Sequence, residues 1–173
     1  DGKLDLHPIL NTIKNAPERT MILLQASCHN PTGIDPTLEQ WQQLSLQILE
    51  KKMIPVFDLA YQGLGKGLAE DVLSIELFMH DGHELFITSS MAKNFGIYSD
   101  RVGALTVVTK NPIDPIASQI RKIIRTTYSS PPAHGARVVT HILTNSAIRA
   151  MWEEDLSHVR DAISVKRHMF QQV

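Results

Sequence analysis

The sequence predicts an α/β fold with a mostly parallel sheet and one antiparallel strand. Short apolar segments alternate with amphipathic segments of helical period, and each of the first three apolar segments is followed by a polar loop. Such an alternation is typical of parallel strands joined by right-handed helical crossovers. The 173 residues contain no internal repeat, low-complexity tract or flexible linker, so one domain is expected.

Four short apolar segments are the expected strands: residues 21–27, 53–60, 84–89 and 102–109. The first three are separated by helical segments, as parallel strands require. The fourth follows the third with too little chain for a helical crossover, which favours antiparallel pairing.

Helices are expected at residues 10–15, 36–52 and 71–80 and in the C-terminal stretch. The second of these begins after Asp35, an expected N-cap with Pro36 at N1, and repeats apolar residues on one face. The C-terminal pattern reaches Val173 without a stop signal, and the chain starts at Asp1 rather than Met. We therefore expect the natural polypeptide to extend beyond both ends.

Charge and composition favour a small-molecule ligand. The formal net charge of −1 gives no basic surface for nucleic acid or an anionic membrane, and no apolar run approaches the ~20 residues that span a bilayer. Cys28 is the only cysteine, so an intramolecular disulfide is impossible and a cytoplasmic protein is expected.

Unusual polar strings follow the first three expected strands: CHNPTG, DLAYQG and SSMAKNFG. In open α/β sheets the ligand binds outside the carboxyl ends of the strands. The three strings are therefore the candidate site, and Lys93 is its candidate nucleophile, because an amine at the mouth of a buried sheet can have a lowered pKa. Taken alone, Lys93 would more often be a solvated surface lysine.

Asp58 closes an apolar run, where a buried carboxylate needs a cation or a strong donor as its partner. Taken alone it could also be a turn or cap residue. Tyr61 would ordinarily be a half-buried tyrosine and Asn30 a turn residue before Pro31. The role of each residue is ambiguous when the residue is considered by itself. The order in which these residues follow one another along the chain is informative.

The three strings together closely resemble the class I pyridoxal-phosphate aminotransferases of the aspartate and aromatic type, and the resemblance covers essentially the whole chain. It implies the large domain of fold type I, a three-layer αβα arrangement, with pyridoxal 5′-phosphate as cofactor. It also implies the following roles: a Schiff base and proton transfer for Lys93, phosphate binding for Ser90 and Arg101, contact with the ring nitrogen for Asp58, and contact with the phenolic oxygen for Tyr61 and Asn30.

The same resemblance implies a substrate site and a dimer. Arg125 corresponds to the arginine that reaches across a homodimer interface to the distal carboxylate of a dicarboxylic substrate, and Asn30 also borders the substrate. Ser130 stands where aspartate-type members usually carry asparagine, which favours the aromatic type without deciding it. We also expect a cis peptide bond before Pro31.

Residues 1–173 are thus expected to be part of the cofactor-binding large domain, with the family's N-terminal segment and C-terminal small domain outside the chain. The expected reaction is transamination between aspartate or an aromatic amino acid and a 2-oxo acid such as 2-oxoglutarate. Two alternatives remain: another reaction of the same cofactor, such as decarboxylation or elimination, and a non-catalytic piece that keeps the fold.

Overall fold

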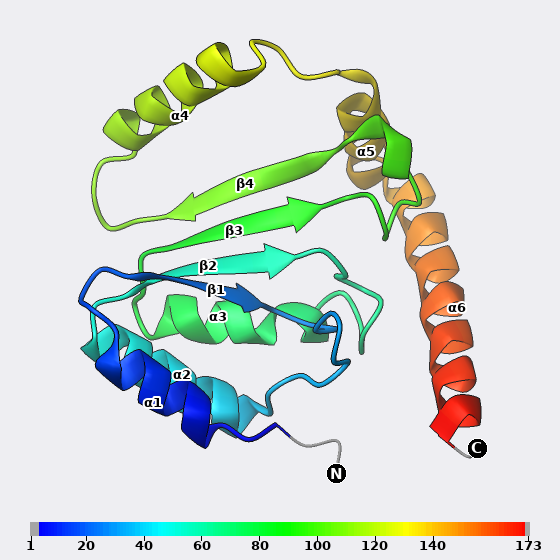
Figure 1. Cartoon of the computed structure of the whole chain (residues 1–173). Coiled ribbons are helices and arrows are strands. Elements are labelled where there is room, and N and C mark those ends of the chain that lie inside the picture. Colours follow the sequence, from blue (N-terminus) through cyan, green and yellow to red (C-terminus); the bar gives the residue numbers. More distant parts are fainter. Residues whose placement is uncertain (1–3, 172–173) are drawn as a thin grey trace.

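The computed structural model describes residues 4–171 and contains a four-stranded mixed sheet in the order β1-β2-β3-β4 (Figure 1). The strands are β1 (Met21–Gln25), β2 (Ile54–Leu59), β3 (Leu85–Ser90) and β4 (Gly103–Val108). The first three pair in parallel, and β4 pairs with β3 in the antiparallel sense. The predicted sheet, including its one antiparallel strand, is confirmed.

Six α-helices and two short 3-10 helices are present among the described residues: α1 (His7–Asn15), α2 (Leu38–Glu50), η1 (Glu70–Val72), α3 (Leu73–His80), η2 (Tyr98–Asp100), α4 (Asp114–Thr127), α5 (His134–Thr144) and α6 (Ser146–Gln171). In Figure 1, α1, α2 and α3 lie along one face of the sheet, α4 lies beyond β4, and α6 runs beside the carboxyl ends of the parallel strands. None of the helices in residues 4–171 is long and apolar enough to cross a membrane.

The start of α2 differs from the prediction. Thr37, not Asp35, is the N-cap: its hydroxyl accepts from the backbone of Gln40, whose side chain accepts from the Thr37 amide in turn. This capping box competes better for the free helix amides than an aspartate two residues earlier. Asp35 instead accepts hydrogen bonds from the backbone amides of Cys28 and His29, at 2.7 and 2.8 Å.

The hydrophobic core lies between the sheet and the layer of α1, α2 and α3. Trp41, Phe57 and Phe78 form an aromatic cluster in which the rings of Phe57 and Phe78 meet edge to face at 5.0 Å. Both phenylalanines are fully buried. Burying apolar area of this size is the main force that fixes the sheet against the helices.

The opposite face of the sheet is open among the described residues. Along β2 the side chains alternate, with Phe57 and Leu59 in the core and Asp58 on the open face. Met21 and Leu23 of β1 lie on that same face and are 60% and 69% exposed. Residues 4–171 therefore supply the sheet and one helical layer of the expected three-layer arrangement.

Candidate active site

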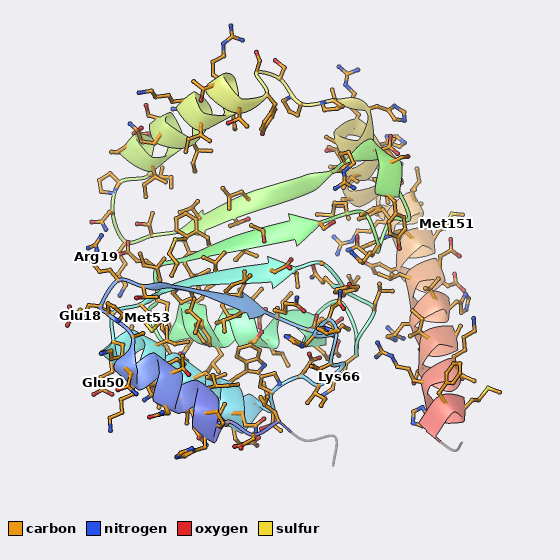
Figure 2. All side chains as sticks on the ribbon, in the orientation of Figure 1. Glu18, Arg19, Glu50, Met53, Lys66 and Met151 are labelled. Carbon is orange, nitrogen blue, oxygen red and sulfur yellow. The ribbon has the colours of Figure 1, made fainter. Side chains whose placement is uncertain are left out.

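The three polar strings meet at one edge of the sheet, because β1, β2 and β3 run in parallel and end together (Figure 1). Figure 2 shows Lys66, in the loop after β2, at this edge and Glu18, Arg19 and Met53 at the opposite edge. The prediction that these loops share one edge is confirmed.

Lys93 lies in the turn that follows β3, between the buried residues Ala92 and Asn94. Its Nζ is 4.6 Å from the centroid of the Tyr61 ring, which places the amine over the aromatic face. The structure therefore joins the third loop to the second through the two residues that the sequence singled out.

Asn30 joins the first loop to the same point. Its Nδ2 donates to the hydroxyl of Tyr61 at 3.3 Å, and its backbone amide donates to Oε1 of Gln25 at 2.7 Å. The Asn30-Pro31 peptide bond is cis, as predicted. Tyr61 is thus the common contact of Asn30 and Lys93.

Asp58 lies on the open face of the sheet, in register with Gln25 of β1 and Thr88 of β3. It is half-buried, and its carboxylate has no hydrogen-bond or ion-pair partner among residues 4–171. A partly desolvated carboxylate favours a strong donor or a cation as its partner. A protonated ring nitrogen of a ligand on this face has that character.

Ser90 and Arg101 lie on the two sides of the connection between β3 and β4. Ser90 pairs with Gly103, and the amide of Met91 donates to the carbonyl of Val102 at 3.0 Å. Arg101 adopts a left-handed backbone conformation (φ 54°), and its guanidinium donates to the carbonyl of Tyr98 at 2.8 Å. A hydroxyl and an exposed guanidinium at this edge could bind the oxygens of a phosphate.

Arg125 is not brought to this group. It lies in the last turn of α4, where its guanidinium donates to the hydroxyl of Ser129. No residue of α4 is buried, and Figure 1 shows this helix beyond β4, away from the helical layer of the core. A role for Arg125 at this chain's own Lys93 is not supported by its position.

Sequence reasoning missed the side chains that hold the loops in place. Asp35 binds the first loop, Asp71 binds the second, and Trp152 of α6 binds the third through the backbone of Asn94. The string GLGKG before Asp71 was the one available signal, since closely spaced glycines indicate a backbone that approaches another group. Asp35 and Trp152 gave no comparable signal.

Comparison with known proteins identifies the family. Residues 1–172 match the family described as aminotransferase class I and II. The chain belongs to that family. The match covers all three loops of the site, so the aminotransferase assignment does not depend on one motif.

Among relatives, the aspartate aminotransferase of Escherichia coli K12 is 46% identical over 169 residues, which are 96% of this chain and 43% of the relative. The mitochondrial aspartate aminotransferase of Arabidopsis thaliana is 42% identical over 163 residues, 92% of this chain and 38% of the relative. The chain thus spans less than half the length of these relatives.

Solved structures of the family superpose closely. The aromatic-amino-acid aminotransferase of Burkholderia pseudomallei, covalently bound to pyridoxal phosphate, is 34% identical with a TM-score of 0.94 over 96% of this chain and 42% of its own. The aromatic aminotransferase of Psychrobacter sp. B6, crystallised with aspartic acid, is 32% identical with a TM-score of 0.96 over 99% of this chain and 44% of its own.

Proposed function

We propose that the protein containing this chain catalyses pyridoxal-phosphate-dependent transamination between an amino acid, aspartate or aromatic, and a 2-oxo acid such as 2-oxoglutarate. One observation carries the proposal: the Lys93 amine, the Tyr61 ring and the Asn30 amide converge at the carboxyl edge of the sheet. The covalently bound pyridoxal phosphate of the Burkholderia pseudomallei enzyme supports the choice of cofactor.

The residues present fit this cofactor. Asp58 offers a half-buried carboxylate without a partner among the described residues, which suits a protonated pyridine nitrogen. Ser90 and Arg101 offer a hydroxyl and a guanidinium for a phosphate, and Tyr61 and Asn30 offer a hydroxyl and an amide for a phenolic oxygen. When bound, pyridoxal phosphate supplies an electron sink that stabilises negative charge at the substrate's α-carbon.

Lys93 has two tasks in this proposal. Its Nζ would be the nucleophile that holds the cofactor, and as a free amine it would be the base that moves a proton to and from the substrate's α-carbon. Tyr61 limits where the amine can go, because its ring lies 4.6 Å from Nζ. Asp58 offers its carboxylate as a partner for the ring nitrogen, which would favour the protonated ring.

The proposal extends to substrate range, assembly and location. We infer a homodimer in which Arg125 of one subunit binds a distal carboxylate in the partner's site, because α4 carries Arg125 away from Lys93 of its own chain. We also infer a cytoplasmic location, which the single cysteine of residues 1–173 favours. The Psychrobacter enzyme, an aromatic aminotransferase crystallised with aspartic acid, supports a range that includes both substrate types. Ser130 is compatible with that range.

The test uses the protein expressed from its full reading frame. Pyridoxal phosphate is added, the complex is reduced with borohydride, and peptides are mapped by mass spectrometry. We expect the cofactor on Lys93, no adduct in Lys93→Ala, and an unchanged adduct in Lys14→Ala, an exposed lysine of α1. Label on many lysines, equal in both variants, would refute the proposed cofactor site.

A second assay separates transamination from its alternatives. Aspartate or phenylalanine is supplied with 2-oxoglutarate, and formation of glutamate is measured. Glutamate formed by the wild type and lost in Lys93→Ala supports transamination. If cofactor binds to Lys93 but no glutamate forms, the protein is a non-catalytic remnant. If carbon dioxide or ammonia is the product, the protein catalyses another reaction of the same cofactor.

A further inference from the structure

A buried carboxylate lies against the backbone of the loop after β2, one of the three loops of the site. Asp71, in η1, is 4% exposed and accepts three backbone hydrogen bonds from the loop after β2. Its Oδ2 accepts from the amides of Gly63 and Gly65 at 2.8 and 3.0 Å, and its Oδ1 accepts from the amide of Lys66 at 2.8 Å. Charge-assisted bonds of this kind offset the cost of burying the carboxylate.

The loop is shaped around this carboxylate. Gly63 has a φ of +88°, and a Cβ there would lie 2.5 Å from Cδ2 of Leu156 on α6. A Cβ on Gly65 would lie 2.5 Å from Oδ1 of Asp71 itself. The backbone is therefore enclosed between Asp71 on one side and α6 on the other, and the two glycines are what permit the close approach.

The same loop carries the residues that contact Lys93 and its turn. Tyr61 begins the loop, and its carbonyl accepts from the amide of Leu64 at 3.0 Å. The next carbonyl, that of Gln62, accepts from Nδ2 of the buried Asn94 at 3.3 Å. A shift of the backbone at residues 63–66 would therefore move both the Tyr61 ring and the support of the Lys93 turn.

We propose that Asp71 is a positioning residue for the active site: by gathering three amides of the loop, it fixes the Tyr61 ring against the Lys93 amine. This inference rests on the proposed function, because Tyr61 and Lys93 matter only if they hold the cofactor. Asp71 acts through the backbone and has no contact with Lys93 or Tyr61 side chains among its hydrogen bonds in the described residues.

The test compares Asp71→Asn with Glu76→Gln in the full-length protein. Asn has the same shape but turns one acceptor into a donor, which cannot bind the amides that face it. Glu76 is an exposed carboxylate of α3 and serves as the matched control. Two quantities are measured: hydrogen exchange of the amides of Gly63, Gly65 and Lys66 without cofactor, and the affinity for pyridoxal phosphate by titration of its absorbance.

We expect Asp71→Asn to speed exchange of these amides and to weaken cofactor binding about tenfold, the size of one lost charge-assisted bond, while Glu76→Gln changes neither. Faster exchange with unchanged affinity would overturn the positioning role and leave Asp71 a structural residue. Unchanged exchange would show that Asp71 does not hold the loop. A wild type that never binds cofactor at Lys93 refutes the proposed function, and the exchange data then still report on the loop.

A second variant covers the case in which Asp71→Asn does not fold. Gly65→Ala leaves Asp71 unchanged but places a methyl group against Oδ1 of that carboxylate. The methyl group therefore displaces the loop away from Asp71. Weaker cofactor binding in folded Gly65→Ala, with faster exchange at the amides of Gly63 and Lys66, supports the inference. Wild-type affinity in Gly65→Ala despite faster exchange overturns it.

Discussion

Nε1 of Trp152 donates a 2.9 Å hydrogen bond to the backbone carbonyl of Asn94, the residue that follows Lys93. The indole also stacks on the ring of Phe95, with the centroids 4.4 Å apart and the planes 11° from parallel. Two contacts from α6 thus hold the turn that presents Lys93, although α6 begins far along the chain. The turn therefore depends on a helix that approaches it from outside the sheet.

Trp152→Phe should loosen this turn while keeping an aromatic ring at position 152. The stack on Phe95 can persist, but the carbonyl of Asn94 loses its donor, so the free energy of unfolding should fall by about 1 kcal/mol. Chemical denaturation measures this change. Met151→Leu, at an exposed neighbouring position on α6 (Figure 2), is the control, and an equal loss in both variants would contradict the role of the hydrogen bond.

The sequence predicted the sheet because the burial of strands and helices produces a periodic pattern of apolar residues within one continuous segment. Lys93, Asp58 and Asn30 could be named as site candidates because each lies in a contiguous string that follows a predicted strand. Long-range polar contacts produce no such pattern. The hydrogen bond between Trp152 and Asn94 is an example, because it joins residues 58 positions apart. The error at Asp35 is a local one: its carboxylate binds two amides six and seven residues earlier in the chain in place of the helix end.

Cys28 should be an unreactive thiol in the folded protein. Burial, together with the nearby carboxylates of Asp71 and Asp35, raises its pKa from 9.0 to about 11. Because the thiolate is the reactive form, a thiol-specific reagent at pH 8 should label native protein much more slowly than urea-unfolded protein. Cys28 is the only cysteine among residues 1–173, and peptide mapping by mass spectrometry assigns the label to it. Equally rapid labelling of both states would contradict the half-buried placement of the thiol.

His83 should make the fold sensitive to acid. The imidazole is buried and stacks on Phe78 at 4.6 Å. Burial lowers the pKa of His83 below its ordinary 6.5, with a further contribution from Lys110, while the Ser45 carbonyl and Asp81 act in the opposite direction. A lowered folded-state pKa gives stability that is present above pH 6.5 and is lost as the pH falls below it.

The free energy of unfolding should therefore decline as the pH falls below about 6.5, because the unfolded chain binds a proton that folded His83 resists. His83→Gln should flatten this part of the curve, whatever its effect on stability at pH 7. His80→Gln, at an exposed histidine of α3, is the control for the substitution itself. An identical slope in wild type and His83→Gln would rule out His83 as the source.

Arg101 offers a test specific for the cofactor's phosphate. If its guanidinium binds phosphate, Arg101→Ala should lower the affinity for pyridoxal phosphate about 10- to 100-fold and leave the affinity for pyridoxal, which has no phosphate, unchanged. Alanine keeps the Cβ, so the strain of the left-handed backbone at φ 54° is the same in both proteins. The comparison then isolates the contribution of the Arg101 guanidinium to phosphate binding.

Arg19→Ala is the matched control for this measurement. Arg19 is an exposed arginine with the same left-handed backbone (φ 61°), but Figure 2 places it at the opposite edge of the sheet. Its removal changes the net charge equally and should leave the preference for the phosphorylated ligand intact. An equal loss of affinity in both variants would mean that general charge attraction, and not a phosphate site at Arg101, draws the cofactor to this edge.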